Sequence, residues 1–405
     1  MRILCSLLGM LCIFVLAFLL SGNRKAINWR TIGGAFAIQA VFGAFVLYTP
    51  IGKDVLLSIT NGVQRVINYS QDGVDFVFGS LGNSGGFVFA INALTIIIFF
   101  SSLISVLYYL GIMQLVIKIL GGALQKALGT SRTESMSATA NIFVGQTEAP
   151  LLVRPYIPNM TQSELFAIMV GGLASVAGAV MVGYSAMGVE LKYLIAASFM
   201  AAPGGLLMAK IIWPETEHDK VQTCELTDDQ MNKPANIIDA AAGGAASGLK
   251  LAANVGAMLL AFVALISLLN GIVGGIGGWF GFDGITVQSM LGYIFSPIAF
   301  VLGIPASEML QAGTLIGEKL VVNEFVAYAD FVHIKDVFSE QSQVIITFAL
   351  CGFANLSSIA ILLGGLGGMA PSRRSDIARM GLKAVVAGCL SNLMSAAIAG
   401  FFLSI

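Results

Sequence analysis

Eight long apolar stretches, separated by polar joins, constrain this chain more than any other feature of its sequence. A helix needs about 20 apolar residues to cross the hydrocarbon core of a bilayer. The stretches are residues 3–20, 32–48, 87–111, 164–189, 193–213, 237–269, 343–366 and 382–405. Only 11% of the 405 residues are charged and 57% are hydrophobic, unlike a soluble globule. The sequence therefore predicts an all-α polytopic membrane protein, and it excludes a soluble enzyme, a nucleic-acid-binding protein and a disordered chain.

Basic residues predict the orientation of the spans. Arg24, Lys25 and Arg30 follow the first apolar stretch, and such residues stay on the cytoplasmic side of a membrane. The N-terminus is therefore expected outside. The first stretch is expected to be a retained span, because the basic residues lie on the wrong side for a cleaved signal peptide. The loop containing Arg373 and Arg374 is expected to be cytoplasmic.

Three further segments are apolar but carry too many polar residues to cross directly. Residues 51–78 have helical amphipathicity together with several charges, which predicts one helix lying along the interface. Residues 113–158 and 271–332 each contain half-length apolar pieces around polar joins with Gly, Pro, Asn and Glu. Irregular backbone is tolerated at membrane depth only where protein or a water-filled cavity satisfies it. We therefore expect two re-entrant hairpins, with the glycines at 271–278 serving turns and close helix contacts.

The two hairpins occupy corresponding places in the two halves of the chain. Each is followed by an apolar span with a polar interruption, at Ser175 and at 353–358, and then by one more span. Paired broken segments of this kind indicate inverted repeats around a transporter binding site. The expected organisation is 1–112 as N-terminal spans and interfacial helix on the scaffold side, 113–213 as first repeat, 214–236 as hydrophilic loop, 237–270 as long scaffold helix and 271–405 as second repeat.

Two acidic residues lie in the polar parts of the hairpins. Glu148 follows Gln146 and Thr147 in the first half, and Glu324 follows Asn323 in the second. Ionisable side chains in apolar segments are costly and mark functional sites. Carboxylates accept hydrogen bonds from hydroxyl and ring N–H groups. The residues predict a polar cleft for a neutral, hydrogen-bonding solute, and the alternative is that both carboxylates cap half-helices.

Asn141 and Ser175 indicate a cation site. Both lie where helices are interrupted, and a freed backbone carbonyl, an amide oxygen and a hydroxyl are ligands of a hard cation. The alternatives are a helix cap for Asn141 and helix packing for Ser175. The role of Glu308 stays open between a gate, a proton-sensitive site and a structural cap. The sequence has no Ser-His pair, HExxH or GxSxG pattern for an enzyme, and no filter motif for a channel.

Three motifs carry a family resemblance. They are residues 145–150 (GQTEAP), 323–327 (NEFVA) and 352–359 (GFANLSSI). In this order they resemble the signature segments of the bacterial concentrative nucleoside transporters, over nearly the whole chain. The resemblance implies eight membrane spans, an interfacial helix and two re-entrant hairpins, assembled as a homotrimer in the bacterial inner membrane, where the external N-terminus expected from the basic residues would be periplasmic. It also implies import of nucleosides with sodium by an elevator-type movement.

The resemblance assigns roles to individual residues. Gln146, Thr147 and Glu148 would face the nucleobase, with Val180 packed on it. Glu324, Asn355 and Ser358 would hold the ribose hydroxyls, and Phe353 and Leu251 would line the pocket. The sodium ligands would be the Asn141 side chain, the Val144 carbonyl, Ser175 and the Val176 carbonyl.

Sodium is the expected coupling ion, and the proton is the alternative. Proton-coupled relatives alter these hairpin positions, so Asn141 and Ser175 favour sodium, while Glu308 leaves proton-coupled nucleoside symport as the second interpretation. Outside symport, a membrane receptor would bind nucleoside without accumulating it, and a channel would equilibrate it without responding to sodium.

Overall fold

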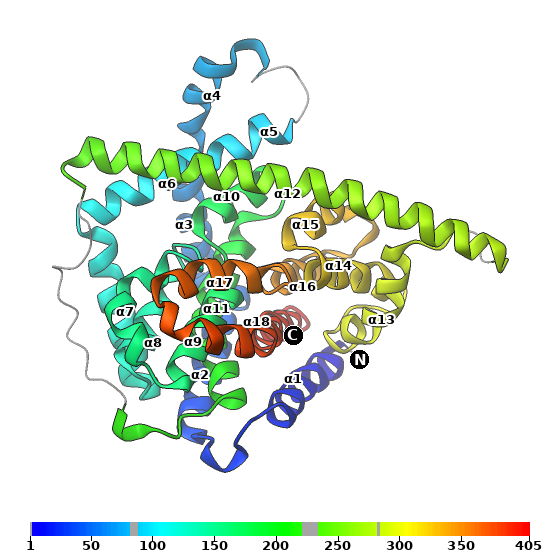
Figure 1. Cartoon of the computed structure of the whole chain (residues 1–405). Coiled ribbons are helices and arrows are strands. Elements are labelled where there is room, and N and C mark those ends of the chain that lie inside the picture. Colours follow the sequence, from blue (N-terminus) through cyan, green and yellow to red (C-terminus); the bar gives the residue numbers. More distant parts are fainter. Residues whose placement is uncertain (1, 82–87, 221–233, 282–283) are drawn as a thin grey trace.

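The computed structural model (Figure 1) describes residues 2–81, 88–220, 234–281 and 284–405, and within these ranges it contains helices and no strands. The α-helices are α1 (Arg2–Leu19), α2 (Trp29–Leu47), α3 (Pro50–Asn68), α4 (Ser70–Phe78), α5 (Phe89–Asn92), α6 (Leu94–Tyr109), α7 (Ile112–Leu128), α8 (Arg132–Ala140), α9 (Gln162–Ala174), α10 (Gly178–Ala186), α11 (Leu191–Ile212), α12 (Ile237–Trp279), α13 (Val287–Val301), α14 (Met309–Val321), α15 (Glu324–His333), α16 (Glu340–Leu350), α17 (Ser358–Met369) and α18 (Arg374–Phe402). The predicted all-α class is confirmed.

The predicted membrane spans are present. Among the described residues, seven helical segments are long and apolar enough to cross a bilayer. The remaining expected span, 343–366, is formed by two half-length helices, α16 and α17, with an irregular break at 351–357. A similar break separates α9 from α10 at 175–177. Counting the broken pair α16/α17, the described residues supply the eight spans expected.

The amphipathic segment at 51–78 forms two helices rather than the single one predicted. Thr49 caps α3, accepting from the Gly52 N–H at 3.1 Å, and Pro50 occupies its first turn. At the other end, the Ser70 hydroxyl donates to the Ile67 carbonyl at 2.6 Å. Such side-chain bonds compete with the helical ladder, which explains the interruption at Tyr69.

The inverted repeats are visible as two runs of the same elements. The first run is α7, α8 with η3 (Ala149–Asn159), the broken pair α9/α10, and α11. The second run is α13, α14 with α15, the broken pair α16/α17, and α18. The first hairpin is shorter than the predicted 113–158, because α7 is a separate helix. Gly129 ends α7 with φ of 67°, and a capping box of Ser131 and Glu134 starts α8.

Helix α12 is longer than predicted. It has 43 residues and continues to Trp279, so the expected boundary at 270 and the turns expected at 271–278 are wrong. Glycine lowers helix propensity, but in an apolar setting an interrupted helix would leave backbone groups without partners. Similarly, α18 begins at Arg374, eight residues before the apolar stretch predicted from 382. Most of the predicted hydrophilic loop 214–236 lies outside the described residues.

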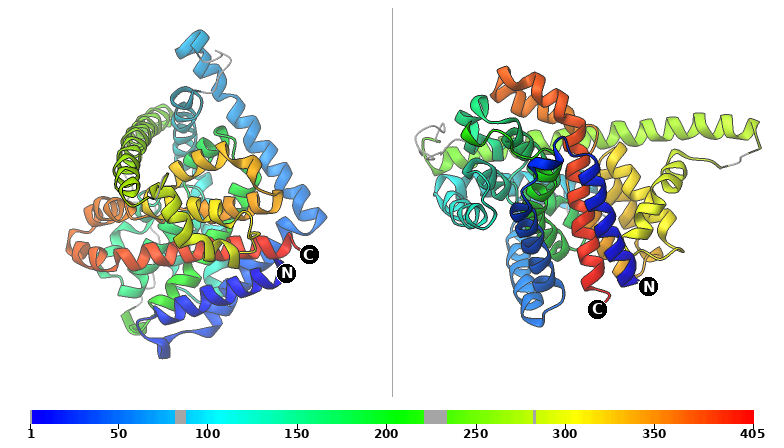
Figure 2. Two further views of the ribbon diagram at one scale, coloured as in Figure 1. Left: turned by 90° about the vertical axis from the view of Figure 1, so that its right-hand side faces the viewer. Right: turned by 90° about the horizontal axis from the view of Figure 1, so that it is seen from below.

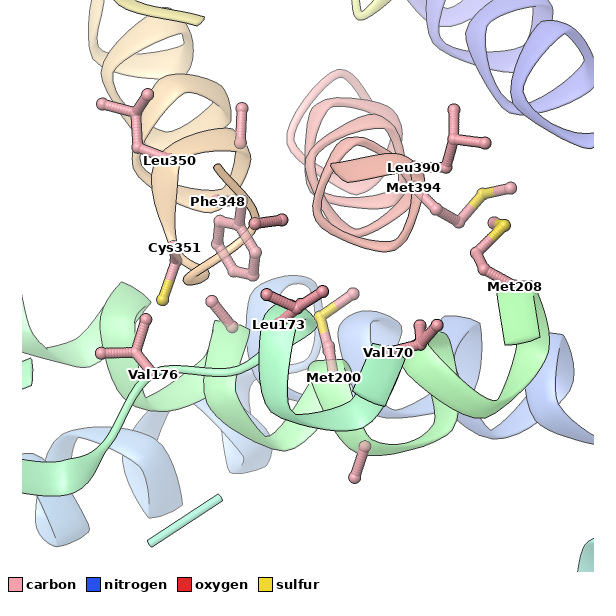
Figure 3. Close-up of a cluster of buried hydrophobic side chains, with 14 of the residues drawn as sticks. Val170, Leu173, Val176, Met200, Met208, Phe348, Leu350, Cys351, Leu390 and Met394 are labelled. Atoms are coloured by element: carbon pink, nitrogen blue, oxygen red, sulfur yellow. The ribbon is translucent and has the colours of Figure 1, made fainter. Parts of the chain in front are cut away.

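The core forms where both repeats meet. Helix α18 packs against α9, α11 and α16, and also against α1. Figure 3 shows side chains from these elements in one cluster, including Leu173, Met200, Phe348 and Met394, all fully buried. Helices α1 and α18 run side by side in both views of Figure 2. The interior of the molecule is therefore built by the repeats together with the N-terminal helices.

Helix α12 lies outside this core and packs mainly along α6 (Figure 1). Two glycines, Gly244 and Gly248, allow the close approach. A Cβ atom added to Gly244 would lie 2.6 Å from Ser105 Cβ, and one added to Gly248 would lie 2.7 Å from Ser101 Cβ. Glycines four residues apart share one helix face and favour tight helix pairing in membranes. The pair α6/α12 thus forms a wall beside the repeats, which α6 contacts through α10 and α7.

Candidate functional site

The first hairpin places its tip against the break between α9 and α10. Helix α8 ends at Asn141, where the backbone leaves the helical path. The Phe143 carbonyl at the tip accepts a hydrogen bond from the Gly178 N–H at 3.0 Å. A Cβ atom added to Gly172 would lie 2.8 Å from Gln146 Cβ, so only glycine lets the tip approach α9 this closely. Residues 141–146 and 175–178, which the sequence separates, are therefore adjacent.

Side-chain oxygens at this junction are buried and unpaired. Asn141 Oδ1, Gln146 Oε1 and Ser137 Oγ have no hydrogen-bond partner among the described residues. The Asn141 amide nitrogen donates to the Ser137 carbonyl at 2.9 Å, and this bond leaves its oxygen available. Leaving a buried polar atom without a partner costs about 1–3 kcal/mol. Buried, unpaired oxygens are the type of ligand that a cation without its water shell needs, and Asn141 is the predicted side-chain ligand among them.

The other predicted cation ligands lie around the same junction. Ser175 ends α9, and its hydroxyl donates to the Gly171 carbonyl at 2.9 Å. Val176 is fully buried in the break, and Val144 is buried at the hairpin tip. The structure thus brings Asn141, Val144, Ser175 and Val176 to one place.

The second hairpin carries a network around Glu324. This residue starts α15, and Asn323 caps the helix by accepting from the Val326 N–H at 2.9 Å. Glu324 Oε2 accepts from Asn355 Nδ2 at 2.9 Å. Asn355 Oδ1 in turn accepts from the Ser358 N–H at 2.9 Å and from the Ser358 hydroxyl at 3.1 Å. The predicted ribose residues Glu324, Asn355 and Ser358 therefore form one buried cluster.

Tyr184 completes this network and was not found from the sequence. Its hydroxyl donates to Glu324 Oε1 at 3.1 Å. The ring is fully buried and contacts the rings of Phe325 and Tyr328, each with centroids 4.6 Å away. Tyr184 belongs to α10 of the first repeat, whereas Glu324 belongs to the second. The sequence signal was the Tyr184 hydroxyl in a mostly apolar run, where Ser185 next to it carries a hydroxyl as well.

A cavity of about 660 Å³ opens between the first hairpin and the α6/α12 wall. Glu148 and Val144 line it from the hairpin, Leu251 lines it from α12, and Ala177 and Ala179 line it from the start of α10. Its size is within the range of small-molecule sites, about 300–1,000 Å³. The carboxyl group of Glu148 provides a hydrogen-bonding group for a ligand on the mostly apolar surface of this cavity.

Of the predicted pocket residues, Glu148 and Leu251 line the cavity, whereas Glu324, Asn355 and Ser358 form the separate network. Helix α10 joins the two regions, because its first turn faces the cavity and Tyr184 lies about 10 Å further along the helix. Val180, on the intervening turn, is buried. Thr147 contacts α17, since a Cβ atom added to Gly365 would lie 2.7 Å from its methyl carbon. Glu324, Asn355, Ser358 and Phe353 do not line the cavity.

The two helix breaks contact each other. The Phe353 N–H donates to the Ser175 carbonyl at 3.1 Å. Asn392 of α18 donates from its amide nitrogen to the Ala174 carbonyl at 2.6 Å and to the Cys351 carbonyl at 2.7 Å. Lys319 donates to Asn392 Oδ1 at 2.7 Å. Neither residue was singled out from the sequence, although a lysine and an asparagine within apolar segments were signals of the same kind as Glu324.

Glu308 has a defined partner. Its Oε2 accepts from the backbone N–H of Ser339 at 3.3 Å and from the Ser339 hydroxyl at 3.2 Å. Ser339 is the residue that precedes α16. Of the three roles left open for Glu308, this contact favours a structural cap that ties α14 to the start of α16.

Comparison with known proteins identifies the family. Residues 193–400 match the domain described as Na+ dependent nucleoside transporter C-terminus, and residues 8–81 match its N-terminus. Residues 90–190 match a domain described as nucleoside recognition. An uncharacterized transporter of Haemophilus influenzae is 61% identical over 100% of this chain and 99% of that protein. Nucleoside permease NupC of Helicobacter pylori is 52% identical over 99% of this chain and 98% of that protein.

Similar solved structures belong to the same family. CNTnw in an inward-facing, substrate-bound state has a TM-score of 0.93 and 58% identity, covering 100% of this chain and 98% of that one. A double mutant of CNTnw in an outward-facing state has a TM-score of 0.96 and 58% identity, covering 100% and 99%. The matched domains cover most of the chain, and the relatives align from end to end. The chain therefore belongs to the Na+-dependent family of concentrative nucleoside transporters, as the three sequence motifs predicted.

Proposed function

We propose that this protein is a secondary active symporter that imports nucleosides, driven by a sodium gradient. The observation that carries the proposal is the junction of the first hairpin tip with the α9/α10 break. At this junction the Asn141 side-chain oxygen is buried and unpaired. The Ser175 carbonyl at the same junction accepts from the Phe353 N–H of the other broken helix. A cation bound at this junction would stabilise the backbone from which the nucleoside site is built.

The Glu324 network supports ribose as the recognised group. Glu324, Asn355 and Ser358 offer a carboxylate, an amide and a hydroxyl within one cluster, which suits vicinal hydroxyl groups that both donate and accept. We assign Gln146, Thr147 and Glu148 to the nucleobase, with Val180 packed against its face. Phe353 and Leu251 supply apolar walls, Leu251 from α12.

Sodium is proposed to bind before the nucleoside. Its ligands would be the Asn141 side chain, the Ser175 hydroxyl and the carbonyls of Val144 and Val176. Because binding at linked sites is reciprocal, sodium raises the affinity for nucleoside by the same factor as nucleoside raises the affinity for sodium. One charge moving through 100 mV supplies about 2.3 kcal/mol, or roughly fiftyfold accumulation.

The loaded site is proposed to cross by an elevator-type movement against the α6/α12 wall. Helix α12 packs almost entirely on α6, and this packing supports a static role for the α6/α12 pair. The sequence placed all of 1–112 on the scaffold side, but α1 packs against α18, and α2 against α11. This packing supports assigning α1 and α2 to the moving core, together with the repeat at 113–213 and the second repeat from α13 onward.

The proposal includes the assembly and its location. We propose a homotrimer in the bacterial inner membrane with a periplasmic N-terminus. Helix α12 has little contact with the core, and apolar residues such as Leu260, Leu268 and Ile276 are exposed on it. Exposed apolar surface of this extent suits contact with lipid or with other protomers.

Uptake of radiolabelled uridine into proteoliposomes tests the proposal. We expect accumulation with an inward sodium gradient and none with an inward proton gradient alone. Accumulation only with protons would establish the alternative, proton-coupled nucleoside symport, and equilibration without accumulation would indicate a channel. Binding without uptake would indicate a receptor.

A further inference from the structure

Asn392 holds the ends of both broken helices with a single amide group. Its nitrogen donates one proton to the Ala174 carbonyl, at the last residue of α9, and the other to the Cys351 carbonyl, directly after α16. The side chain is buried, so no water competes for these bonds. Because the amide is planar and rigid, the two carbonyls are fixed relative to each other.

Lys319 fixes the orientation of this amide. The ammonium group donates to Asn392 Oδ1 at 2.7 Å and to the Ala349 carbonyl at 3.3 Å. Since the oxygen of the amide accepts from Lys319, its nitrogen must point at the carbonyls. A positive charge near the carbonyl end of a helix is also favourable, and α9 and α16 both end at this point.

Glycines let α18 enter the space between the two breaks. A Cβ atom added to Gly388, one turn before Asn392, would lie 3.0 Å from Leu173 Cβ and 3.0 Å from Ala354 Cβ. A Cβ atom on Gly352 would collide with the Asn392 side chain, with Nδ2 only 2.6 Å away. Helix α18 is therefore in direct contact with both helix breaks, the one after α9 and the one after α16.

The bonded carbonyls lie beside the two halves of the proposed site. Ala174 directly precedes Ser175, an assigned sodium ligand, and Cys351 is followed within four residues by Phe353 and Asn355 on the nucleoside side. We propose that Asn392, oriented by Lys319, is a positioning residue that transmits sodium binding in the first repeat to the nucleoside site in the second. The inference rests on the proposed sodium coupling and adds the residues that carry it.

The test measures uridine binding to the full-length protein with and without sodium. The readout is the ratio of the Kd in choline to the Kd at saturating sodium. In Asn392→Asp, the oxygen that faces Lys319 is kept, while the nitrogen that donates to both carbonyls is lost. We expect the ratio to fall at least fivefold, with the Kd in choline within about threefold of wild type.

Ser395→Ala is the matched control. Ser395 is buried on the same helix one turn later, but its hydroxyl accepts from Gln39 at 2.9 Å and donates to the Ser391 carbonyl of α18 at 3.2 Å. We expect the wild-type ratio in this variant. If Asn392→Asp is not stable enough to purify, Asn392→Ser replaces it, since the shorter hydroxyl carries one proton and cannot serve both carbonyls.

The outcomes separate this inference from the proposed function. An intact ratio in the Asn392 variant overturns the inference. This holds even if affinity falls, because an equal fall in choline and in sodium is a purely structural effect. A wild-type ratio of one means that sodium does not assist binding, which contradicts the proposed function and the inference with it. A reduced ratio confined to the Asn392 variant supports the inference.

Discussion

The hydroxyl of Tyr184 donates to Glu324 Oε1 at 3.1 Å across the boundary between the two repeats. Asn355 occupies the other carboxylate oxygen at 2.9 Å. Glu324 is therefore oriented by one residue from each repeat. The carboxylate can recognise a ligand only in the direction that these two contacts leave open.

Replacing Tyr184 by Phe is expected to weaken uridine binding. The change removes one hydrogen bond to a buried carboxylate, which costs about 1–2 kcal/mol, or roughly 5–30-fold in Kd. Isothermal titration in saturating sodium measures the effect. Tyr328→Phe is the control, because Tyr328 is equally buried but donates to the Thr347 carbonyl at 2.8 Å rather than to Glu324. Equal losses in both variants would contradict the role of Tyr184.

Replacing Glu324 by Gln is expected to remove selectivity for the ribose hydroxyls. Wild type should bind uridine more tightly than 2′,3′-dideoxyuridine, and the variant should bind uridine about 1–3 kcal/mol more weakly. The affinity for the dideoxy compound should change much less. Competition binding with both ligands gives the comparison. A variant that still distinguishes the two ligands as wild type does would remove Glu324 from the ribose site.

Replacing Asn141 by Ala is expected to raise the sodium concentration for half-maximal uptake at least tenfold, since about 1.4 kcal/mol corresponds to a factor of ten. The buried oxygen of Asn141 is the side-chain ligand that the change removes. Thr139→Val is the control, because the Thr139 hydroxyl on the same helix donates to the Ser135 carbonyl at 2.8 Å. An unchanged sodium dependence in Asn141→Ala would show that the cation binds elsewhere.

The buried ion pair between Lys210 and Glu134 is expected to hold the first hairpin to α11. Lys210 also donates to the Ser163 hydroxyl at 2.8 Å. Replacing Lys210 alone by Met leaves a buried carboxylate without its partner, at a cost of about 3–5 kcal/mol. The double variant Lys210→Met, Glu134→Gln should recover part of this loss. Thermal unfolding in detergent measures both, and a double variant no more stable than the single one would refute the pairing.

Replacing Gly248 by Ile is expected to separate α12 from α6. The added side chain would meet Ser101 and the backbone of Ile98, whose Cα lies 2.8 Å from the position of a Cβ atom. Overpacking of this kind costs about 1–3 kcal/mol. Gly271→Ile on the same helix is the control, because a Cβ atom there has no neighbour within 4 Å. Similar melting temperatures for the two variants would argue against a close α6/α12 contact.

Local sequence patterns were enough to predict the spans, the hairpins and the paired breaks. Runs of apolar residues identify membrane helices, and Asn141, Ser175 and Asn355 stand out because polar residues are costly there. The length of α12 was missed, because the glycines after residue 270 have the composition of a turn. The split between α3 and α4 coincides with a local hydroxyl bond, from Ser70 to Ile67, which a hydropathy pattern does not contain.

Contacts between distant residues could not be predicted. Glu324 and Tyr184 are 140 positions apart, and Asn392 and Ala174 are 218 apart. The sequence indicates that each side chain needs a partner but does not identify it, since the pairing depends on how the two repeats interlock. The family resemblance assigned the ligand-facing residues, while the supporting residues Tyr184, Lys319 and Asn392 became apparent only from the packed helices.

The bond from Phe353 to the Ser175 carbonyl has a consequence for synthesis of the protein. The Ser175 carbonyl has this backbone partner only when a segment about 180 residues downstream has left the ribosome, roughly 10–35 s later at 5–20 residues per second. During that interval the first half must satisfy this carbonyl in another way, for example with water. Insertion of the first four spans and their final closure are therefore separate events, and the nascent chain matures only after its second half has been translated.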